Sequence, residues 1–269
     1  KLGNNNAAGE YYLTDTVAVA EKKGVYTADS TDVVLGANSR SQLAALNEVA
    51  RKRKLAELMD EGVDIPLSDG IIIGKDVKIG HDTVILPNTI IKGNTVIGNG
   101  CEIGPNSYIA DCVIEDNVIL NNVQAHESKV DSKAKAGPFV HLRPNTHLHS
   151  GVKIGDFVEV KNSEVGINTC IAHLTYVGDS DVGKGVNFGC GCVTANYDGI
   201  KKYRTTIGDN AFIGCHTNLI APVTIGDNAT TAAGSTITKN VPADSLAVER
   251  GQTRIIEHWE KNSKRIKKA

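Results

Sequence analysis

Aliphatic residues recur at every sixth position along much of the chain. The first block of this repeat contains seven isoleucines in register, with glycine directly after four of them: Ile73, Ile79, Ile85, Ile91, Ile97, Ile103 and Ile109. The spacing returns from Val165 to Val177 and from Ile207 to Ile237, where Thr231 takes one of the repeat positions. A period of six fits neither the 3.6-residue period of a helix nor the simple alternation of an exposed strand. It predicts a short strand followed by a turn, repeated many times.

Each hexapeptide is expected to form one flat side of a coil. The aliphatic residue points inward and stacks on its equivalent in the next coil, while Gly and Asn take the corners because they tolerate positive φ. The low aromatic content of 4% suits a narrow interior. Stacked coils pair their strands in parallel and leave free edges only at the two ends. The repeat therefore predicts a parallel β-helix from Gly70 to about Val248, although spacing alone does not fix its hand.

Two segments, Ser128–Ser150 and Asn196–Thr205, are expected to interrupt the repeat. Loops that leave a rigid scaffold often carry function. The second segment opens with Asn196 and Tyr197 and carries Lys201 and Lys202, which suits an arm that reaches over a phosphate-bearing ligand. A tolerated insertion is the alternative.

The residues before the repeat have a different sequence pattern. Residues 1–38 lack the six-residue period, and we predict a helical stretch near Thr14–Lys23, a strand at Thr31–Leu35 and, overall, a short α/β remnant of another domain. Residues 39–65 are predicted to form a linker containing an α-helix of about twenty residues, which starts at a capping box from Ser39 to Gln42 and stops at Gly62. Its apolar stripe is Leu43, Leu46, Ala50, Leu58 and Met59. The expected division continues with the β-helix at 66–249 and a tail at 250–269.

Composition narrows the classes of function. A net charge of −2 gives no support for a nucleic-acid or anionic-membrane partner. The basic tail is interpreted as a solvated end, and its cations are Lys261, Lys264, Arg265, Lys267 and Lys268. With no long apolar run and no signal segment, we expect a soluble, cytoplasmic protein. Because Met59 is the only methionine, we also expect the chain to be part of a longer protein. The scattered cysteines are expected to be free thiols.

A histidine with nearby cations is the main candidate for chemistry. His173 lies inside a coil, and histidine is the side chain most used for proton transfer at neutral pH. Arg143, Lys161 and Glu159 come from the preceding coils. Two cations suit a phosphate, and a carboxylate beside an imidazole orients it and raises its basicity. A lone histidine on such a face is more often structural, so the residues alone leave its role open.

Several motifs together resemble one family. They are Gly137-Pro-Phe-Val-His-Leu-Arg-Pro144, Gly155-Asp-Phe-Val-Glu-Val-Lys161, His173-Leu-Thr-Tyr-Val-Gly-Asp179, Val186-Asn-Phe-Gly189, Asn196-Tyr-Asp-Gly199 and Ala221-Pro-Val223. In this order they resemble the bacterial bifunctional glucosamine-1-phosphate N-acetyltransferase / N-acetylglucosamine-1-phosphate uridyltransferase family. The resemblance implies a left-handed β-helix, a homotrimer with acetyl-CoA between neighbouring prisms, and a role in UDP-N-acetylglucosamine and peptidoglycan synthesis.

The resemblance also implies roles for individual residues. His173 is the general base for the sugar amine, and Glu159 supports it. The implied sugar-phosphate contacts are Arg143, Lys161, Tyr176, Asn187 and Asn196. The implied acetyl-CoA contacts are Cys190, Asn196, Tyr197, Lys202, Cys215, Ala233 and Arg250. Cys215 and Cys190 stand where the family often has Ser and Ala, and a backbone N–H near Cys190 is expected to stabilise the oxyanion.

The front of the chain resembles the end of the family's nucleotidyltransferase domain, which places Asn38 at the position of a magnesium ligand. The Gly-rich nucleotide loop that precedes it in the family is absent from this chain. We therefore expect no uridyltransferase activity from these residues alone.

Three alternatives remain. A zinc hydratase of the β-helix type needs three converging histidines, for which His141, His147 and His149 are candidates by number. We favour solvated or packing roles for them, because they crowd one irregular loop. A purely structural solenoid is expected to show a regular Thr array, which this sequence lacks. A covalent route through Cys190 or Cys192 is disfavoured because no orienting base accompanies either thiol.

Overall fold

The computed structural model describes residues 2–259. Their contacts separate into two units that divide between Ala50 and Arg51. The basic cluster predicted to be a solvated tail lies outside the described residues.

The first unit contains short helical elements. These are the 3₁₀ helices η1 (Leu13–Asp15) and η2 (Thr31–Val34) and the α-helix α1 (Thr16–Val19). The predicted helical stretch is present but shorter. The predicted strand at Thr31–Leu35 is wrong, because the Ser30 hydroxyl accepts a hydrogen bond from the Asp32 N–H at 3.1 Å and starts a turn instead.

The linker helix α2 (Arg40–Asp60) forms as predicted. Ser39 accepts a hydrogen bond from the Gln42 N–H at 3.2 Å, and the Gln42 side chain accepts one from the Asn38 N–H at 2.7 Å, so the cap is reciprocal. Gly62 ends the helix at φ +93°, a conformation that glycine adopts without strain. Of the predicted stripe Leu58 is buried, whereas Leu43 and Met59 are exposed.

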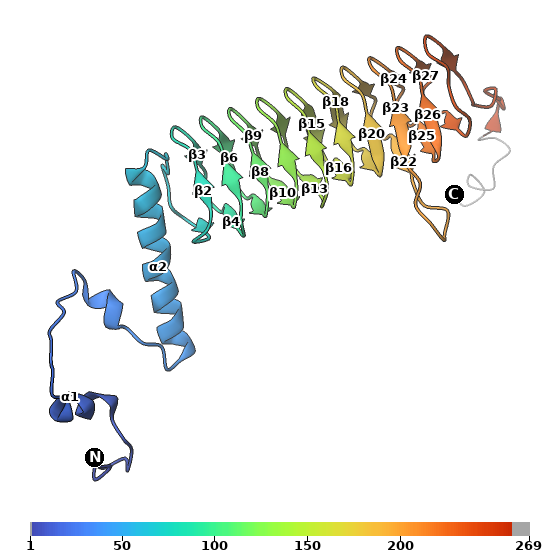
Figure 1. Ribbon diagram of the computed structural model, residues 1–269. Helices are drawn as coiled ribbons and strands as arrows, with labels where there is room; N and C mark the ends of the chain where they lie inside the picture. Colours follow the sequence, from blue (N-terminus) through green and yellow to red (C-terminus); the bar gives the residue numbers. More distant parts are fainter. Residues whose placement is uncertain (1, 260–269) are drawn as a thin grey trace. The chain divides into compact units, whose positions relative to one another are not determined.

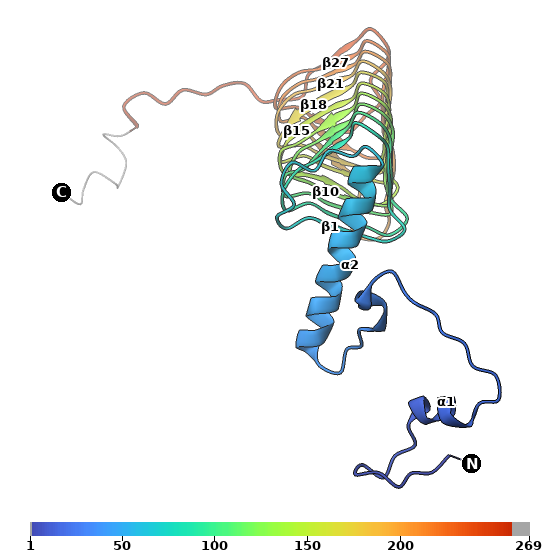
Figure 2. The ribbon, with the colours of Figure 1, turned by 90° about the vertical axis from the view of Figure 1, so that its left-hand side faces the viewer.

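The second unit contains a left-handed parallel β-helix of about ten coils (Figures 1 and 2). Each coil contributes one short strand to each of three parallel sheets, which we name the first, second and third faces in chain order. The first face contains β1 (Ile72–Ile73), β4 (Ile90–Lys92), β7 (Tyr108–Ala110), β10 (Val123–His126), β13 (Val140–Leu142), β16 (Glu159–Lys161), β19 (Tyr176–Gly178), β22 (Val193–Ala195), β25 (Asn218–Ile220) and β28 (Thr236–Ile237).

The second and third faces follow the same order. The second face contains β2 (Lys78–Ile79), β5 (Val96–Ile97), β8 (Val113–Ile114), β11 (Lys129–Val130), β14 (His147–Leu148), β17 (Glu164–Val165), β20 (Ser180–Val182), β23 (Thr205–Ile207) and β26 (Val223–Ile225). The third face contains β3 (Val84–Ile85), β6 (Glu102–Ile103), β9 (Ile119–Leu120), β12 (Lys135–Ala136), β15 (Lys153–Asp156), β18 (Cys170–His173), β21 (Asn187–Phe188), β24 (Phe212–Ile213), β27 (Thr230–Thr231) and β29 (Leu246–Ala247).

The inward positions form the core. Ile85, Ile91 and Ile109 are fully buried, as the repeat predicted. Thr231 replaces an aliphatic residue at one inward position, and its hydroxyl is satisfied there by the Gly214 N–H and the Thr217 hydroxyl, both at 3.1 Å. A polar residue can therefore occupy the core without an unpaired hydrogen-bonding group.

The interruption predicted at Ser128–Ser150 is wrong. This segment forms the regular strands β11 to β14, with Val130, Leu142 and Leu148 buried. The coil length changes instead: Ile90 pairs with Tyr108 eighteen residues later, whereas Tyr108 pairs with Gln124 after only sixteen. Turns that lose residues before Ser128 shift the phase of the repeat relative to its first block, and from Lys129, which pairs with His147 eighteen residues later, the regular coil length returns.

The second predicted interruption is confirmed. Ser180 pairs with Thr205, a separation of twenty-five residues, so this coil carries a loop (orange in Figure 1). A single antiparallel bridge between Tyr197 and Lys202 closes the loop, and the Tyr203 N–H donates to the Asn196 carbonyl at 2.8 Å.

Two further observations concern residues 2–259. No helix there is both long enough and apolar enough to cross a bilayer. All of the cysteines are free thiols: Cys101, Cys112, Cys170, Cys190, Cys192 and Cys215.

Candidate active site

The first face carries the residues predicted to hold the sugar phosphate. His141 on β13 pairs with Glu159 on β16, and this register places Arg143 directly beside Lys161 where the chain turns toward the second face. The Arg143 Nη1 atom lies 2.7 Å from Glu159 Oε1, and this ion pair raises the pKa of Arg143. Both side chains are more than a third exposed, so the pair contributes little to stability and its charges are accessible to a ligand.

A third cation reaches the same place from the loop. Lys202 lies against Lys161, and its ammonium, together with partial burial, lowers the pKa of Lys161 below its ordinary value. The Arg143 charge acts in the same direction. Three cations that repel one another at one edge form an arrangement that an anion stabilises, because it neutralises the repulsion.

Asp179 organises this edge, a role that its position in the sequence did not predict. It is 5% exposed, follows β19, and accepts hydrogen bonds from the side-chain amides of Asn162 and Asn196. The Asn196 amide also lies 3.4 Å from the Tyr176 hydroxyl. The sequence could have predicted this contact, because the polar residues Asn162 and Asp179 fall at the same corner one coil apart.

Four of the predicted acetyl-CoA residues lie along a different edge, namely Cys190, Cys215, Ala233 and Arg250, whereas Asn196 and Lys202 lie at the cationic edge. Cys170 pairs with Asn187, Asn187 with Phe212 and Phe212 with Thr230, and this register stacks four corner residues on one another between the third and first faces. The corner residues, which we name the axial column, are His173, Cys190, Cys215 and Ala233. Backbone contacts confirm the stacking, since the Cys190 carbonyl accepts from the His216 N–H and the Cys215 carbonyl from the Gly234 N–H.

Arg250 closes the axial column at its far end. Its Nη1 atom donates to the Ala233 carbonyl at 3.0 Å. Adjacent coils are about 5 Å apart, so His173 and Ala233 stand about 14 Å apart along the column. Asn187 lies on the third face and Tyr197 is 60% exposed on the loop, so neither belongs to the column.

The carboxylate beside His173 is Asp156. Asp156 pairs in register with His173, and its Oδ1 atom lies 3.7 Å from the His173 Nδ1 atom. Glu159, the residue predicted to support the imidazole, instead pairs with Arg143 in this chain. His173 and the cations lie at opposite edges of the first face, so a single chain does not bring them together.

Cys192 does not have the environment of a nucleophile. Its thiol is buried, which raises its pKa to about 11, and it donates a hydrogen bond to the Gly214 carbonyl at 3.1 Å. A thiol protonated at neutral pH is a poor nucleophile, which disfavours a covalent route through this residue.

The sequence suggested two metal sites, a magnesium ligand at Asn38 and a three-histidine zinc site. Asn38 is exposed, and its role as a magnesium ligand stays a prediction. The three-histidine site of the hydratase alternative is not formed, because His141 lies on the first face while His147 lies on the second. His147 and His149 also stand on a regular coil, not on the irregular loop predicted from the sequence.

Comparisons with known proteins agree with the fold. The family described as bacterial transferase hexapeptide (six repeats) matches residues 94–123 and 204–239. Among solved structures, LpxA, a UDP-N-acetylglucosamine acyltransferase from Bacteroides fragilis, aligns with a TM-score of 0.52 at 17% identity, covering 67% of this chain and 70% of that one. At this identity the likeness shows the fold alone.

Curated relatives are much more similar in sequence. The bifunctional protein GlmU of Acetivibrio thermocellus is 50% identical over 263 residues, which are 96% of this chain and 57% of that protein. GlmU of Clostridium acetobutylicum is 47% identical over 262 residues, covering 96% of this chain and 58% of that protein. The chain therefore spans a little over half the length of these relatives. At this identity across nearly all of its own length, the chain belongs to the family of the bifunctional GlmU proteins.

Proposed function

We propose that the chain transfers the acetyl group of acetyl-CoA to the amine of glucosamine-1-phosphate, with residues 66–249 as the acetyltransferase domain. The observation that carries this proposal is the axial column, which stacks His173, Cys190, Cys215 and Ala233 and ends at Arg250. A straight column of small side chains with a base at one end and a cation at the other suits an extended acyl-CoA.

The ends of the column match the ends of such a cosubstrate. The thioester is proposed to lie at His173, while Arg250 attracts the negatively charged nucleotide end. Cys215 and Ala233 are small, so a pantetheine chain can approach the backbone groups of the corner. A backbone N–H near Cys190 is proposed to face the carbonyl oxygen, where one such donor contributes about 3 kcal/mol in other acyl transfers.

The cationic edge is proposed to bind the sugar phosphate. Arg143 and Lys161 present charged donors from adjacent strands, and Lys202 adds a third from the loop. Tyr176 and Asn196 lie beside them and are proposed to contact the sugar, as is Asn187 from a neighbouring surface.

The proposed reaction needs one base and no covalent enzyme intermediate. The sugar amine attacks the thioester carbonyl carbon, and His173 accepts the proton that the nitrogen loses. The C–S bond then breaks, an amide forms, and the departing thiolate takes the proton from the imidazolium. Asp156, whose Oδ1 atom lies 3.7 Å from His173 Nδ1, is proposed to orient the ring for this step.

We infer that the working site is shared between copies of the chain. In one chain His173 and the cations stand at opposite edges of the first face, so we propose that a substrate meets the base of one copy and the cations of its neighbour. Prisms packed side by side bring one edge of a first face against the other edge of a neighbour. A homotrimer with closed three-fold symmetry satisfies this for all copies at once.

Coupled assays test the proposal. Purified protein is mixed with acetyl-CoA and glucosamine-1-phosphate, thiol release is followed, and the turnover number of His173→Ala is expected to fall by about 10²- to 10⁴-fold, the range for a general base. His81→Ala serves as the control, since His81 is an exposed corner histidine many coils away. Equal rates for wild type and His173→Ala would remove His173 from its proposed role.

A further inference from the structure

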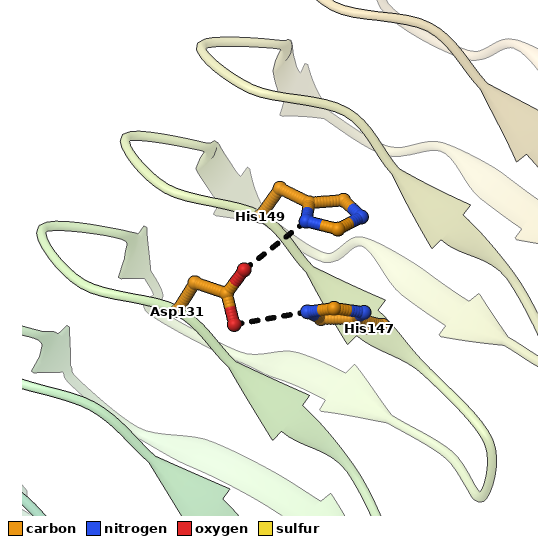
Figure 3. A group of neighbouring side chains, drawn as sticks. All are labelled: Asp131, His147 and His149. Atoms are coloured by element: carbon orange, nitrogen blue, oxygen red, sulfur yellow. Dashed lines mark hydrogen bonds and ion pairs between the residues drawn. The ribbon is translucent and has the colours of Figure 1, made fainter.

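A second cluster of ionisable side chains lies on the second face, apart from the proposed active site. It contains Asp131, His147, His149 and Glu164, which come from three successive coils. Figure 3 shows the first three of these side chains. Leu148 points into the core between the two histidines, so both imidazoles point outward from the same place. None of these residues takes part in the proposed acetyl transfer.

Asp131 is shared by both rings. Its Oδ1 atom lies 2.9 Å from His147 Nε2, and its Oδ2 atom lies 3.1 Å from His149 Nδ1 (Figure 3). The Asp131 side chain is only 12% exposed.

Glu164 holds the opposite side of the same two rings. Its Oε2 atom lies 2.9 Å from His147 Nδ1 and 3.1 Å from His149 Nε2. In metal centres a ligating histidine usually donates its second N–H to a carboxylate, which fixes the tautomer and strengthens the ligand. The structure therefore contains both halves of that arrangement: one carboxylate beside the inner nitrogens and one beside the outer nitrogens.

The four ring nitrogens cannot all be satisfied by neutral histidines. A neutral imidazole has one N–H and one lone pair, yet both nitrogens of each ring face a carboxylate oxygen at 3.1 Å or less. If each ring donates to Glu164, its lone pair points at Asp131. A cation between the rings and Asp131 uses these lone pairs and the carboxylate as ligands.

We propose that Asp131, His147 and His149 bind a divalent transition-metal cation, Zn²⁺ in particular, with Glu164 orienting both imidazoles. Two nitrogens and one carboxylate oxygen are a ligand set that Zn²⁺ uses, and one ligand atom from each residue lies within 4.8 Å of the others. A water completes the tetrahedral coordination. Because the ligands come from neighbouring coils, the bound cation cross-links them and stabilises this part of the β-helix.

Lys129 competes with the cation. Its ammonium lies 2.9 Å from Asp131 Oδ1, and its other carboxylate neighbour is Glu115 at 3.7 Å. Metal binding requires this ammonium to move toward Glu115. Removing the Lys129 charge is therefore expected to strengthen binding, which a purely structural network of ion pairs does not predict.

The test uses the metal alone. The chain is treated with a chelator, dialysed and titrated with Zn²⁺, with bound metal measured by elemental analysis and the thermal midpoint measured in parallel. Wild type is expected to bind one more equivalent than His147→Asn/His149→Asn, and only wild type is expected to show a rise in midpoint with that equivalent. His81→Asn is the control, because His81 contacts one carboxylate, Asp82, without a second histidine.

Two further variants keep the proposal testable if the double variant folds poorly. Glu164→Gln is expected to weaken Zn²⁺ binding about 10- to 100-fold without changing its stoichiometry. Lys129→Met is expected to bind more tightly than wild type. Equal stoichiometry in wild type and His147→Asn/His149→Asn overturns the proposal, as does an unchanged affinity in both Glu164→Gln and Lys129→Met. Replacing Zn²⁺ by Co²⁺ separates this site from the exposed thiol of Cys215, since only thiolate ligation gives a sulfur-to-metal absorption band.

Discussion

The coils near the start of the β-helix and those in its second half differ in regularity and in chemistry. From β1 to β4 each strand pairs with one eighteen residues later, and no candidate site residue stands in these coils. From β13 onward the separations include seventeen and twenty-five residues, and the candidates of the β-helix, from Arg143 to Arg250, all lie there.

The difference shows what each part contributes. Uniform coils stack identical aliphatic residues and form a wall with little variation in its surface. Coils that lose or gain residues at corners keep the same core, yet they move polar side chains relative to their neighbours. The proposed site residues therefore lie in coils whose turns vary in length while their inward positions stay buried.

The core of a uniform coil gives the largest expected effect on stability. Ile91→Ala removes a fully buried side chain and leaves a cavity in a narrow interior, so we expect unfolding to become about 2–5 kcal/mol easier. Ile72→Ala is the matched control, because Ile72 is 45% exposed on the same face. Chemical denaturation measures both, and similar losses for the two variants would contradict the assignment of inward positions.

Deleting residues 197–203 tests the irregular coil. The deletion shortens a twenty-five-residue coil to eighteen and removes Lys202 and Tyr197, so the fold is expected to survive while catalytic efficiency falls about 100-fold. Loss of charged contacts worth about 2–3 kcal/mol corresponds to that factor. Circular dichroism and acetyl-transfer kinetics check the two halves of this prediction, and full activity after the deletion would remove the loop from the site.

Lys202→Ala sharpens the role of the cationic edge. We expect KM for glucosamine-1-phosphate at neutral pH to rise about tenfold, the effect of losing one charged contact. Lys202 lowers the pKa of Lys161, so in wild type Lys161 loses its charge at a lower pH than an ordinary lysine. Sugar-phosphate affinity therefore weakens as pH rises, and in Lys202→Ala this alkaline loss is expected at higher pH.

The pH dependence of KM measures this shift. Lys78→Ala is a control, since Lys78 lies on the second face of a uniform coil. An alkaline limb that stays at the same pH in Lys202→Ala would show that Lys202 does not influence Lys161.

The smallest expected effect is at Cys215. Cys215→Ser keeps a small side chain at the axial column and is expected to change the KM for acetyl-CoA by less than about threefold, because a backbone contact does not depend on the side chain. Thiol alkylation gives a second comparison. Cys215 is exposed and is expected to react, whereas buried Cys192, with its pKa raised to about 11, is expected to resist. A large loss of activity in Cys215→Ser would assign that thiol a direct role.

Much of the fold was predictable from the inward residues. The isoleucines from Ile73 to Ile109 predicted the stacked coils because each coil there has the same length. The prediction failed at Ser128–Ser150, because shorter turns in the preceding coils had shifted the phase, and at Thr31–Leu35, where a local hydrogen bond from Asp32 to Ser30 favoured a turn. A repeat pattern reveals only residues at equal spacing. It misses coils that continue to stack when the turns between them change length.

The sequence by itself determined the β-helix, the loop at Asn196 and the candidate residues for acetyl transfer, since all of these depend on spacing and residue type along the chain. Only the tertiary structure decided which side chains meet. Asp156 lies beside His173, Glu159 pairs with Arg143, Asp179 holds two asparagines, and two histidines share Asp131 on the second face. Each of these contacts joins neighbouring coils, and the length of the intervening turns, one residue more or less, sets which residues stand opposite each other.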